Sequence, residues 1–133
     1  MLNYFKNLED QESEGQSLQV NFHRRSVKGE FKVFKMTDNG FRIVFIPALN
    51  LSGYGKDEDE AFDLLKFSID EYFNSLFKLK IDRIQNELGL LGWKQDRLHH
   101  KRFHNVAFVD KQGILKNFNL PAETHIEEMA LSV

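Results

Sequence analysis

The sequence predicts one small α+β domain: three antiparallel strands in a meander, a long helix that continues or kinks into a second helix, and a C-terminal strand. Two observations lead to this prediction. Between residues 18 and 46, apolar residues largely alternate with polar ones and are rich in β-branched and aromatic types, which is typical of strands. From residue 57 onward, apolar residues recur every three or four positions, which is typical of a helix with one buried face.

The length and composition fit a single domain with one hydrophobic core. The chain has 133 residues, of which 41% are hydrophobic and 13 are Phe. A chain of this length buries roughly two-thirds of the surface that its unfolded form exposes, so it needs no crosslink to fold. It contains no Cys, which excludes disulfides, thiol nucleophiles and thiolate metal sites.

Three features predict a cytoplasmic protein. The absence of Cys agrees with a reducing compartment. No apolar stretch approaches the roughly 20 residues that a membrane-spanning helix needs. Residues 1–10 lack the basic start and the apolar run of a signal peptide.

A polar arm is predicted to precede the domain. Residues 1–16 end in an acidic run that cannot bury enough apolar surface to offset its ordering entropy, so we expect a flexible segment. Leu2, Phe5 and Leu8 have the spacing of a short docked helix, which is the alternative. The domain itself is expected over residues 17–133.

The predicted meander has three strands and one well-marked turn. The alternating segments are residues 18–22, 31–36 and 41–46, the last of them more continuously apolar. Asn39 and Gly40 stand between the second and third segments. Asn-Gly is a strong signal for a tight hairpin because both residues tolerate positive φ.

A helix is predicted to begin just after the third strand and a loop. Pro47 cannot donate to a strand ladder and ends the strand, while Gly53 and Gly55 indicate a turn-rich loop. Asp57 is a good N-cap, and Glu60 stands three residues later, as in a capping box. Acidic residues at this position also complement the helix dipole.

The second half of the chain has a weaker pattern. Apolar residues at helical spacing over 81–91, followed by Gly92, predict a helix with a glycine-terminated end. Residues 106–109 and 114–118 fit either a strand or a short helix. Residues 125–133 alternate weakly and predict a final strand.

The acidic run Asp57, Glu58, Asp59 and Glu60 has two interpretations. Hard oxygen ligands suit Mg²⁺ or Ca²⁺, but the spacing of a calcium-binding loop is absent. Capping and dipole complementation explain the run without a metal. The same carboxylates could contact a basic protein partner, and we take them as a candidate partner-binding site.

A group of histidines lies in the basic stretch. If residues 94–105 were helical, Asp96, His100 and His104 would lie along one side, with the two histidines at the spacing of a metal site. The interleaved basic residues would repel a cation, so no metal site and no cofactor are predicted. A solvated basic loop is the simpler interpretation.

The same stretch is a candidate nucleic-acid-binding site. Basic side chains can contact phosphates, and aromatic rings can stack on bases. The candidate residues are Trp93, Lys94, Arg97, His99, His100, Lys101 and Arg102. Trp93 also fits a core position beneath the end of the helix.

No catalytic motif is recognisable. There is no Gly-x-Ser-x-Gly elbow for a nucleophilic serine. The segments 31–36 and 41–46 carry no carboxylates of the kind that a metal-dependent nuclease requires. We therefore predict a protein that is not an enzyme.

Two segments resemble the HicB antitoxin family. Residues 39–49, Asn-Gly-Phe-Arg-Ile-Val-Phe-Ile-Pro-Ala-Leu, and residues 52–61, Ser-Gly-Tyr-Gly-Lys-Asp-Glu-Asp-Glu-Ala, resemble its hairpin strand, glycine loop and acidic helix cap. Ala48 replaces the Asp that is usual there. Residues 88–94, Leu-Gly-Leu-Leu-Gly-Trp-Lys, and the closing segment 125–133 are similar to divergent HicB-like proteins.

The resemblance implies a β-β-β-α-β core and a toxin-binding role. No ribbon-helix-helix or helix-turn-helix follows the final strand, so repression of an operon is not expected. We predict a non-catalytic binding module whose partners are a small basic, toxin-like protein and a second copy of the chain. The alternative is a protein that binds or cleaves RNA through residues 93–104.

Overall fold

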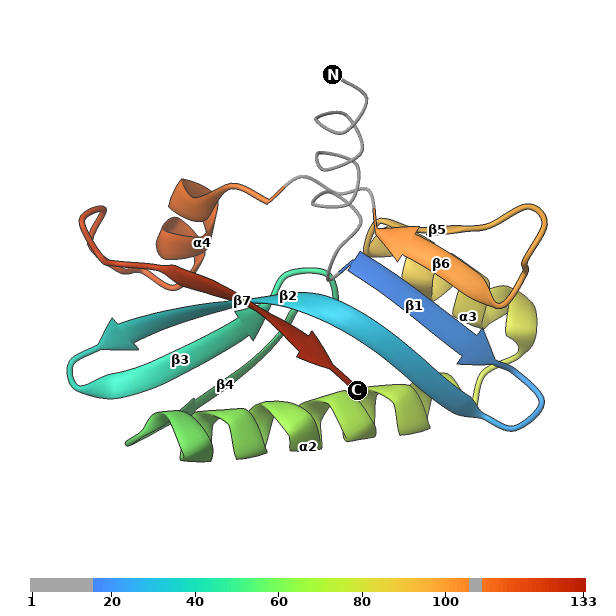
Figure 1. The fold of residues 1–133 in the computed structure, drawn as a ribbon, viewed down its shortest axis with the longest axis horizontal. Helices are drawn as coiled ribbons and strands as arrows, with labels where there is room; N and C mark the ends of the chain where they lie inside the picture. Colours follow the sequence, from blue (N-terminus) through green and yellow to red (C-terminus); the bar gives the residue numbers. More distant parts are fainter. Residues whose placement is uncertain (1–15, 106–108) are drawn as a thin grey trace, which may run out of the picture.

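The computed structural model describes residues 16–105 and 109–133, which form one antiparallel sheet with helices on both faces (Figure 1). Apart from Gln16, the predicted arm lies outside the described residues. The elements in chain order are β1 (Gln16–Asn21), β2 (Ser26–Asp38), β3 (Phe41–Ile46), β4 (Leu51–Gly55), α2 (Glu58–Leu76), α3 (Ile81–Leu90), β5 (Trp93–Gln95), β6 (Arg102–Asn105), α4 (Lys111–Asn117) and β7 (Glu127–Ser132). In the described part of the chain, no helix is long and apolar enough to cross a membrane.

The predicted α+β class is confirmed, but the predicted three-stranded meander is wrong, because the sheet has seven strands and β1 and β3 do not lie on opposite edges of β2. β1 pairs antiparallel with β2, and β2 pairs antiparallel with β3. Asn39 and Gly40 form the turn between β2 and β3, with φ angles of 49° and 84°. The sheet is larger than predicted, because it has seven strands, hydrogen-bonded in the order β4-β3-β2-β1-β6-β5, with β7 also paired to β2.

The long strand β2 organises the sheet. Glu30 and Phe31 pair with both β1 and β7, whereas Phe34 and Lys35 pair with both β3 and β7. A strand has only two edges, and β7 keeps one unbroken register along β2. β7 therefore occupies one edge of β2, and β1 and β3 share the other edge end to end. In Figure 1, β7 crosses the twisted β2 in projection.

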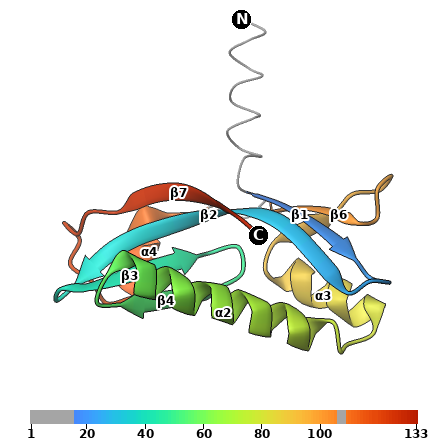
Figure 2. The ribbon, with the colours of Figure 1, turned by 60° about the horizontal axis from the view of Figure 1, so that its bottom comes forward.

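The main core lies between one face of the sheet and the helices α2 and α3 (Figure 2). Gly53 and Gly55 of β4 allow α2 to approach the sheet closely. A Cβ atom on Gly53 would lie 2.7 Å from the backbone nitrogen of Leu65, and one on Gly55 would lie 2.6 Å from the Cβ of Glu60. Among the residues buried in this core are Leu18, Val20, Phe31, Val44, Ile46, Leu65, Ile69, Phe73, Leu88, Trp93 and Phe103.

A second, smaller core lies on the opposite face of β2 and β3, beneath α4. Phe34 and Met36 of β2 and Phe45 of β3 point to this face, where they pack with Ile114 and Leu115 of α4. Strand residues alternate between the two faces, so β2 and β3 are buried on both sides. This explains why residues 41–46 are more continuously apolar than the other predicted strands.

Several boundaries differ from the sequence-based prediction. The predicted loop around Gly53 and Gly55 is wrong, because these residues belong to the edge strand β4, which pairs with β3. The long helix does not continue: α2 ends at Leu76, and α3 begins at Ile81. Residues 93–105, where no element was predicted, contain β5 and β6.

The two open alternatives near the C-terminus have different outcomes. Residues 114–118 overlap α4, so the short helix is the correct alternative there. Of the segment 106–109, residues 106–108 lie outside the described residues. The predicted final strand is confirmed as β7, within the predicted range 125–133.

Candidate functional site

The sheet face opposite α2 and α3 is polar where β2, β1 and β6 run side by side. Gln19 of β1 pairs with Lys28 of β2 and with Arg102 of β6, so these three side chains form one row across the sheet. Directly paired residues in an antiparallel sheet point to the same face. All three side chains are exposed, and no described residue forms a core over them.

A second row lies beside the first. Ser17 pairs with Glu30 and with His104, and His104 pairs with Lys94 of β5. The row therefore runs from a carboxylate on β2 to a lysine on β5. Glu30 is the acidic side chain closest in register to the row of Lys28 and Arg102.

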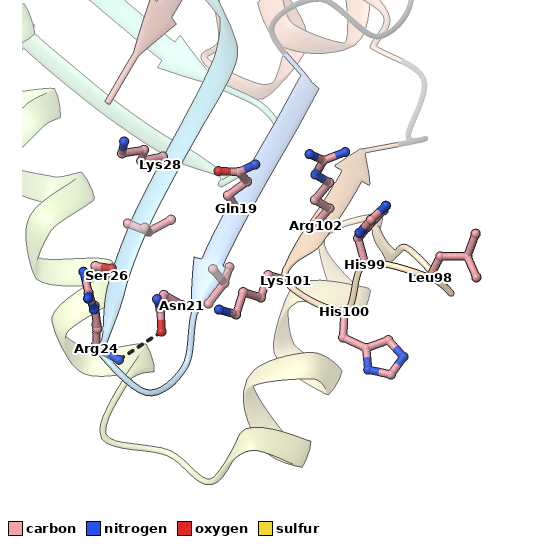
Figure 3. A pocket seen from close by; sticks show the side chains of 12 residues that line it. Gln19, Asn21, Arg24, Ser26, Lys28, Leu98, His99, His100, Lys101 and Arg102 are labelled. Atoms are coloured by element: carbon pink, nitrogen blue, oxygen red, sulfur yellow. Dashed lines mark hydrogen bonds between the residues drawn. The ribbon is translucent and has the colours of Figure 1, made fainter.

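The first row forms the floor of a groove that we call the basic groove (Figure 3). Its walls are the turn between β1 and β2 and the loop between β5 and β6. It has a volume of about 670 Å³. The residues that line it are Gln19, Val20, Asn21, Arg24, Ser26, Val27, Lys28, Leu98, His99, His100, Lys101 and Arg102.

Among the described residues, those that line the basic groove include cations and no carboxylate. Arg24, Lys28, Lys101 and Arg102 are all exposed, and two histidines lie beside them. Within residues 16–105 and 109–133, none of these four cations forms an ion pair. Their positive potential is therefore directed into the groove, and Glu30 in the neighbouring row is the described carboxylate closest to them in register.

The loop that forms one wall of the groove is held by hydrogen bonds. The Asp96 carboxylate accepts hydrogen bonds from the backbone N–H groups of Leu98, at 2.9 Å, and His99, at 3.3 Å. These bonds hold the pKa of Asp96 below its ordinary value. The Gln95 side chain donates to the carbonyl of His100 at 2.6 Å. Residues 97–101 of the loop are exposed, as expected for a solvated basic loop, and these hydrogen bonds give it a defined turn.

The opposite wall is held in a similar way. The backbone N–H of Arg24 donates to the side-chain oxygen of Asn21 at 3.0 Å (Figure 3). Arg25 has a φ of 53°, which lets the four-residue turn close. The turn places Arg24 beside the groove.

The predicted nucleic-acid-binding residues divide into three groups. His99, His100, Lys101 and Arg102 line the basic groove. Lys94 is exposed in the neighbouring row, and Arg97 is exposed in the loop without lining the groove. Trp93 is buried.

Trp93 is 4% exposed and is unavailable for stacking on a base. Its indole N–H donates to the carbonyl of Ala48 at 2.8 Å, and its ring meets Phe31 edge-on. The core position that the sequence also allowed is therefore correct for this residue. Sequence reasoning missed Arg24 and Lys28, because the strand register that brings them to the loop 96–101 cannot be read from the charge pattern.

Asp96, His100 and His104 do not lie along one side of a helix. Residues 96–101 form a loop, and His104 lies in β6. Among the residues that the structure describes, no group of three or more His, Asp or Glu side chains has the arrangement of a metal site.

The acidic run at the start of α2 caps the helix, as predicted. The Asp57 side chain accepts a hydrogen bond from the backbone N–H of Glu60 at 2.8 Å. Glu58 forms an ion pair with Lys35 at 2.6 Å, and this hydrogen-bonded pairing raises the pKa of Lys35. Asp59 is exposed.

The outer face of α2 combines acidic and apolar side chains, and we call it the acidic face. Leu64 and Phe67 are 40% and 62% exposed. They lie three residues apart and therefore adjoin on the helix surface. The acidic face consists of Glu60, Asp63, Leu64, Phe67, Asp70 and Glu71.

Charge is therefore segregated across the sheet. α2 carries six acidic residues and a single lysine, whereas the basic groove lies on the sheet face that α2 does not cover. The small net charge of the chain gives no indication of this separation of acidic and basic surfaces. Comparisons of the chain with protein-family models, with curated proteins and with solved structures find no match.

Proposed function

We propose that the protein is a cytoplasmic, non-catalytic binding module of the HicB-like kind, related to antitoxins, that holds a small basic protein against the acidic face of α2. One observation carries this proposal: an exposed apolar pair lies within a set of carboxylates. Leu64 and Phe67 supply the apolar pair, and Glu60, Asp63 and Asp70 lie among the carboxylates around it.

The exposed pair has the properties of a docking point. Protein interfaces place aromatic side chains at the centre and polar side chains at the rim. Phe67 fits the central role because its ring is largely accessible. The rim of the acidic face is negative, so a complementary partner presents lysines or arginines around an apolar pocket.

The resemblance to HicB antitoxins supports the same role. Its specific parts are residues 39–61 and 88–94, and the first of these forms β3, β4 and the capped start of α2. These elements position the acidic face, because Gly53 and Gly55 set the distance between α2 and the sheet. A toxin-like partner is small and basic, which matches the charge of this face.

Self-association is the second part of the proposal. In the described part of the chain, β7 pairs with β2 on one edge and with no strand on the other. Gly29 and Val133 exchange both backbone hydrogen bonds, at 3.4 Å and 2.9 Å. Because this pattern alternates, the N–H and C=O groups of Glu128, Ala130 and Ser132 point away from β2. They form an open edge that a second copy can pair with.

The protein-binding role can be tested by capture from the native cell extract followed by mass spectrometry. Wild type is compared with Phe67→Ala and with Ile81→Ala, which removes an apolar side chain of 53% exposure from the start of α3. We expect one small basic protein in near-stoichiometric amount with wild type and with Ile81→Ala. Phe67→Ala should reduce its recovery at least tenfold.

Two outcomes would contradict the proposed role. Equal recovery of the basic protein with Phe67→Ala and wild type would remove the acidic face as its site. Cleavage of added RNA that disappears in the double variant His99→Ala and His100→Ala would show that the protein is a nuclease.

A further inference from the structure

We infer that the basic groove binds single-stranded RNA, on the sheet face opposite the acidic face. The inference does not depend on a protein partner, because the two surfaces share no residue. It rests on the row of Lys28, Gln19 and Arg102 across the floor, together with Arg24 and Lys101 at the walls.

The charge of the groove selects a polyanion. Four permanent cations line it, and no carboxylate of residues 16–105 or 109–133 does. None of the four is neutralised by an ion pair in the described part of the chain. Phosphate groups held by such side chains release their counterions, and this release supplies most of the affinity of nonspecific nucleic-acid binding.

The width of the groove favours a single strand. Lys28 and Arg102 are separated by one intervening strand, β1, so their Cα atoms lie two strand spacings apart, about 10 Å. This distance admits one sugar–phosphate backbone with a cation on each side. The cations at the walls, Arg24 and Lys101, extend the same arrangement beyond the first row (Figure 3).

The floor offers hydrogen-bonding groups that suit ribose. Gln19, Asn21 and Ser26 lie between the two basic walls. Their amide and hydroxyl groups can both donate to and accept from a 2′-hydroxyl, the group by which proteins distinguish RNA from DNA. RNA is therefore favoured over single-stranded DNA.

The groove is less suited to an acidic protein. Protein interfaces need an apolar centre that is excluded from water. Among the apolar residues that line the groove, Val20 is fully buried, and Leu98 is 88% exposed in the loop that forms one wall. No Trp, Tyr or Phe in the described part of the chain lines the groove, so we expect phosphate contacts to dominate and sequence preference to be weak.

Fluorescence anisotropy with a labelled, mixed-sequence single-stranded RNA of 12 nucleotides tests the inference. The groove variant replaces Lys28 and Arg102 by Gln. The matched control replaces Lys66 and Lys78 by Gln, which removes the same charge from exposed positions outside the groove. A second groove variant, Arg24→Gln with Lys101→Gln, guards against a folding defect in the first, and circular dichroism checks all three.

We expect both groove variants to bind the RNA at least tenfold more weakly than wild type, while the control variant changes less than twofold. The dependence of log K on log salt concentration should flatten by about 1.4 in each groove variant, since each lost phosphate contact on a single strand contributes about 0.7.

Four outcomes would overturn the inference. They are no binding by wild type at low salt, equal losses in groove and control variants, equal affinity for a DNA strand of the same sequence, or tighter binding of a polyglutamate peptide than of RNA. Failure of the basic-protein capture by the acidic face would leave the RNA result unaffected, so the two proposals can fail separately.

Discussion

The indole N–H of Trp93 donates a 2.8 Å hydrogen bond to the carbonyl of Ala48, which joins β5 to the loop after β3. Both residues are buried, so the carbonyl has no access to bulk water. We predict that Trp93→Phe destabilises the fold by about 2–4 kcal/mol, because it leaves a buried acceptor without a donor and removes core volume. Urea denaturation followed by circular dichroism measures the loss.

The same variant separates the two roles that the sequence allowed for this residue. Since the ring lies in the core, Trp93→Phe should leave RNA affinity within twofold of wild type under conditions where the variant is folded. A normal free energy of unfolding together with a large loss of RNA binding would reverse this assignment.

The contact between Gly53 and α2 predicts opposite effects for two glycine-to-alanine substitutions. A Cβ atom on Gly53 would meet the backbone of Ala61 and Leu65, and a helix backbone cannot move aside as a side chain can. Gly53→Ala should therefore lower the free energy of unfolding by about 1–3 kcal/mol or more.

Gly89 is the matched control, because an added Cβ there would have no neighbour within 4 Å. It lies within the helix α3, where replacing glycine by alanine stabilises by roughly 0.5–1 kcal/mol. Thermal unfolding of both variants tests the pair, and a stabilised Gly53→Ala would mean that α2 is not held against β4.

The cap of α2 gives a third prediction. Asp57 accepts the backbone N–H of Glu60, so Asp57→Ala should cost about 1 kcal/mol. Asp57→Asn keeps the acceptor and should cost only a few tenths of this amount. Equal losses for the two variants would indicate that charge, and not the hydrogen bond, carries the effect.

The elements that could be predicted from the sequence are those with a local signal. The turn at Asn39 and Gly40 and the cap at Asp57 depend on residues close together in the chain, and both are confirmed. β4 was missed because Gly53 and Gly55 suggest a turn, whereas here they make room for a helix. The requirement for glycine at these two positions arises from the packing of α2 against β4, and the sequence pattern does not show this packing.

In the candidate site, too, the features with a local sequence signal could be predicted, and those that depend on strand pairing could not. The basic character of residues 94–104 is visible in the sequence, and part of that stretch lines the groove. Lys28 could not be associated with it, because the association requires both the β1–β2 register and the β1–β6 register. A three-residue strand such as β5 carries too short a pattern to be recognised by periodicity.

The hydrogen bonds from Leu98 and His99 to Asp96 give a prediction about pH. These bonds hold the pKa of Asp96 below its unfolded value of about 3.9. Because the folded pKa is lower than the unfolded pKa, the Asp96 carboxylate stabilises the folded loop fully above the unfolded pKa. This stabilisation is lost as the pH falls through the folded pKa. The loop 96–101 should therefore keep its conformation to below about pH 3.9.

Backbone amide chemical shifts measured by NMR test this prediction. The amide signals of Leu98 and His99 should move together in a single titration with a midpoint below the ordinary aspartate value. In Asp96→Ala, both amides should exchange with solvent faster at neutral pH. A midpoint at or above the ordinary value would mean that the two hydrogen bonds do not form in solution.

The free edge of β7 predicts how two copies associate. The outward-pointing groups of Glu128, Ala130 and Ser132 can pair antiparallel with the same segment of a second copy about Ala130, which places Glu128 opposite Ser132 and avoids opposing carboxylates. We expect wild type to be a dimer by light scattering. Ala130→Pro should be a monomer, because proline removes an outward N–H without breaking a hydrogen bond to β2.

Ala130→Thr is the matched control for this edge. It keeps the N–H and adds a β-branched side chain that strands favour, so the dimer should persist. Folding of each variant is checked by circular dichroism. A dimer that survives Ala130→Pro must use another surface. A wild-type protein that stays monomeric at every concentration would show that this edge does not pair. Charged residues on an edge strand, such as Glu127 and Glu128, can prevent such pairing.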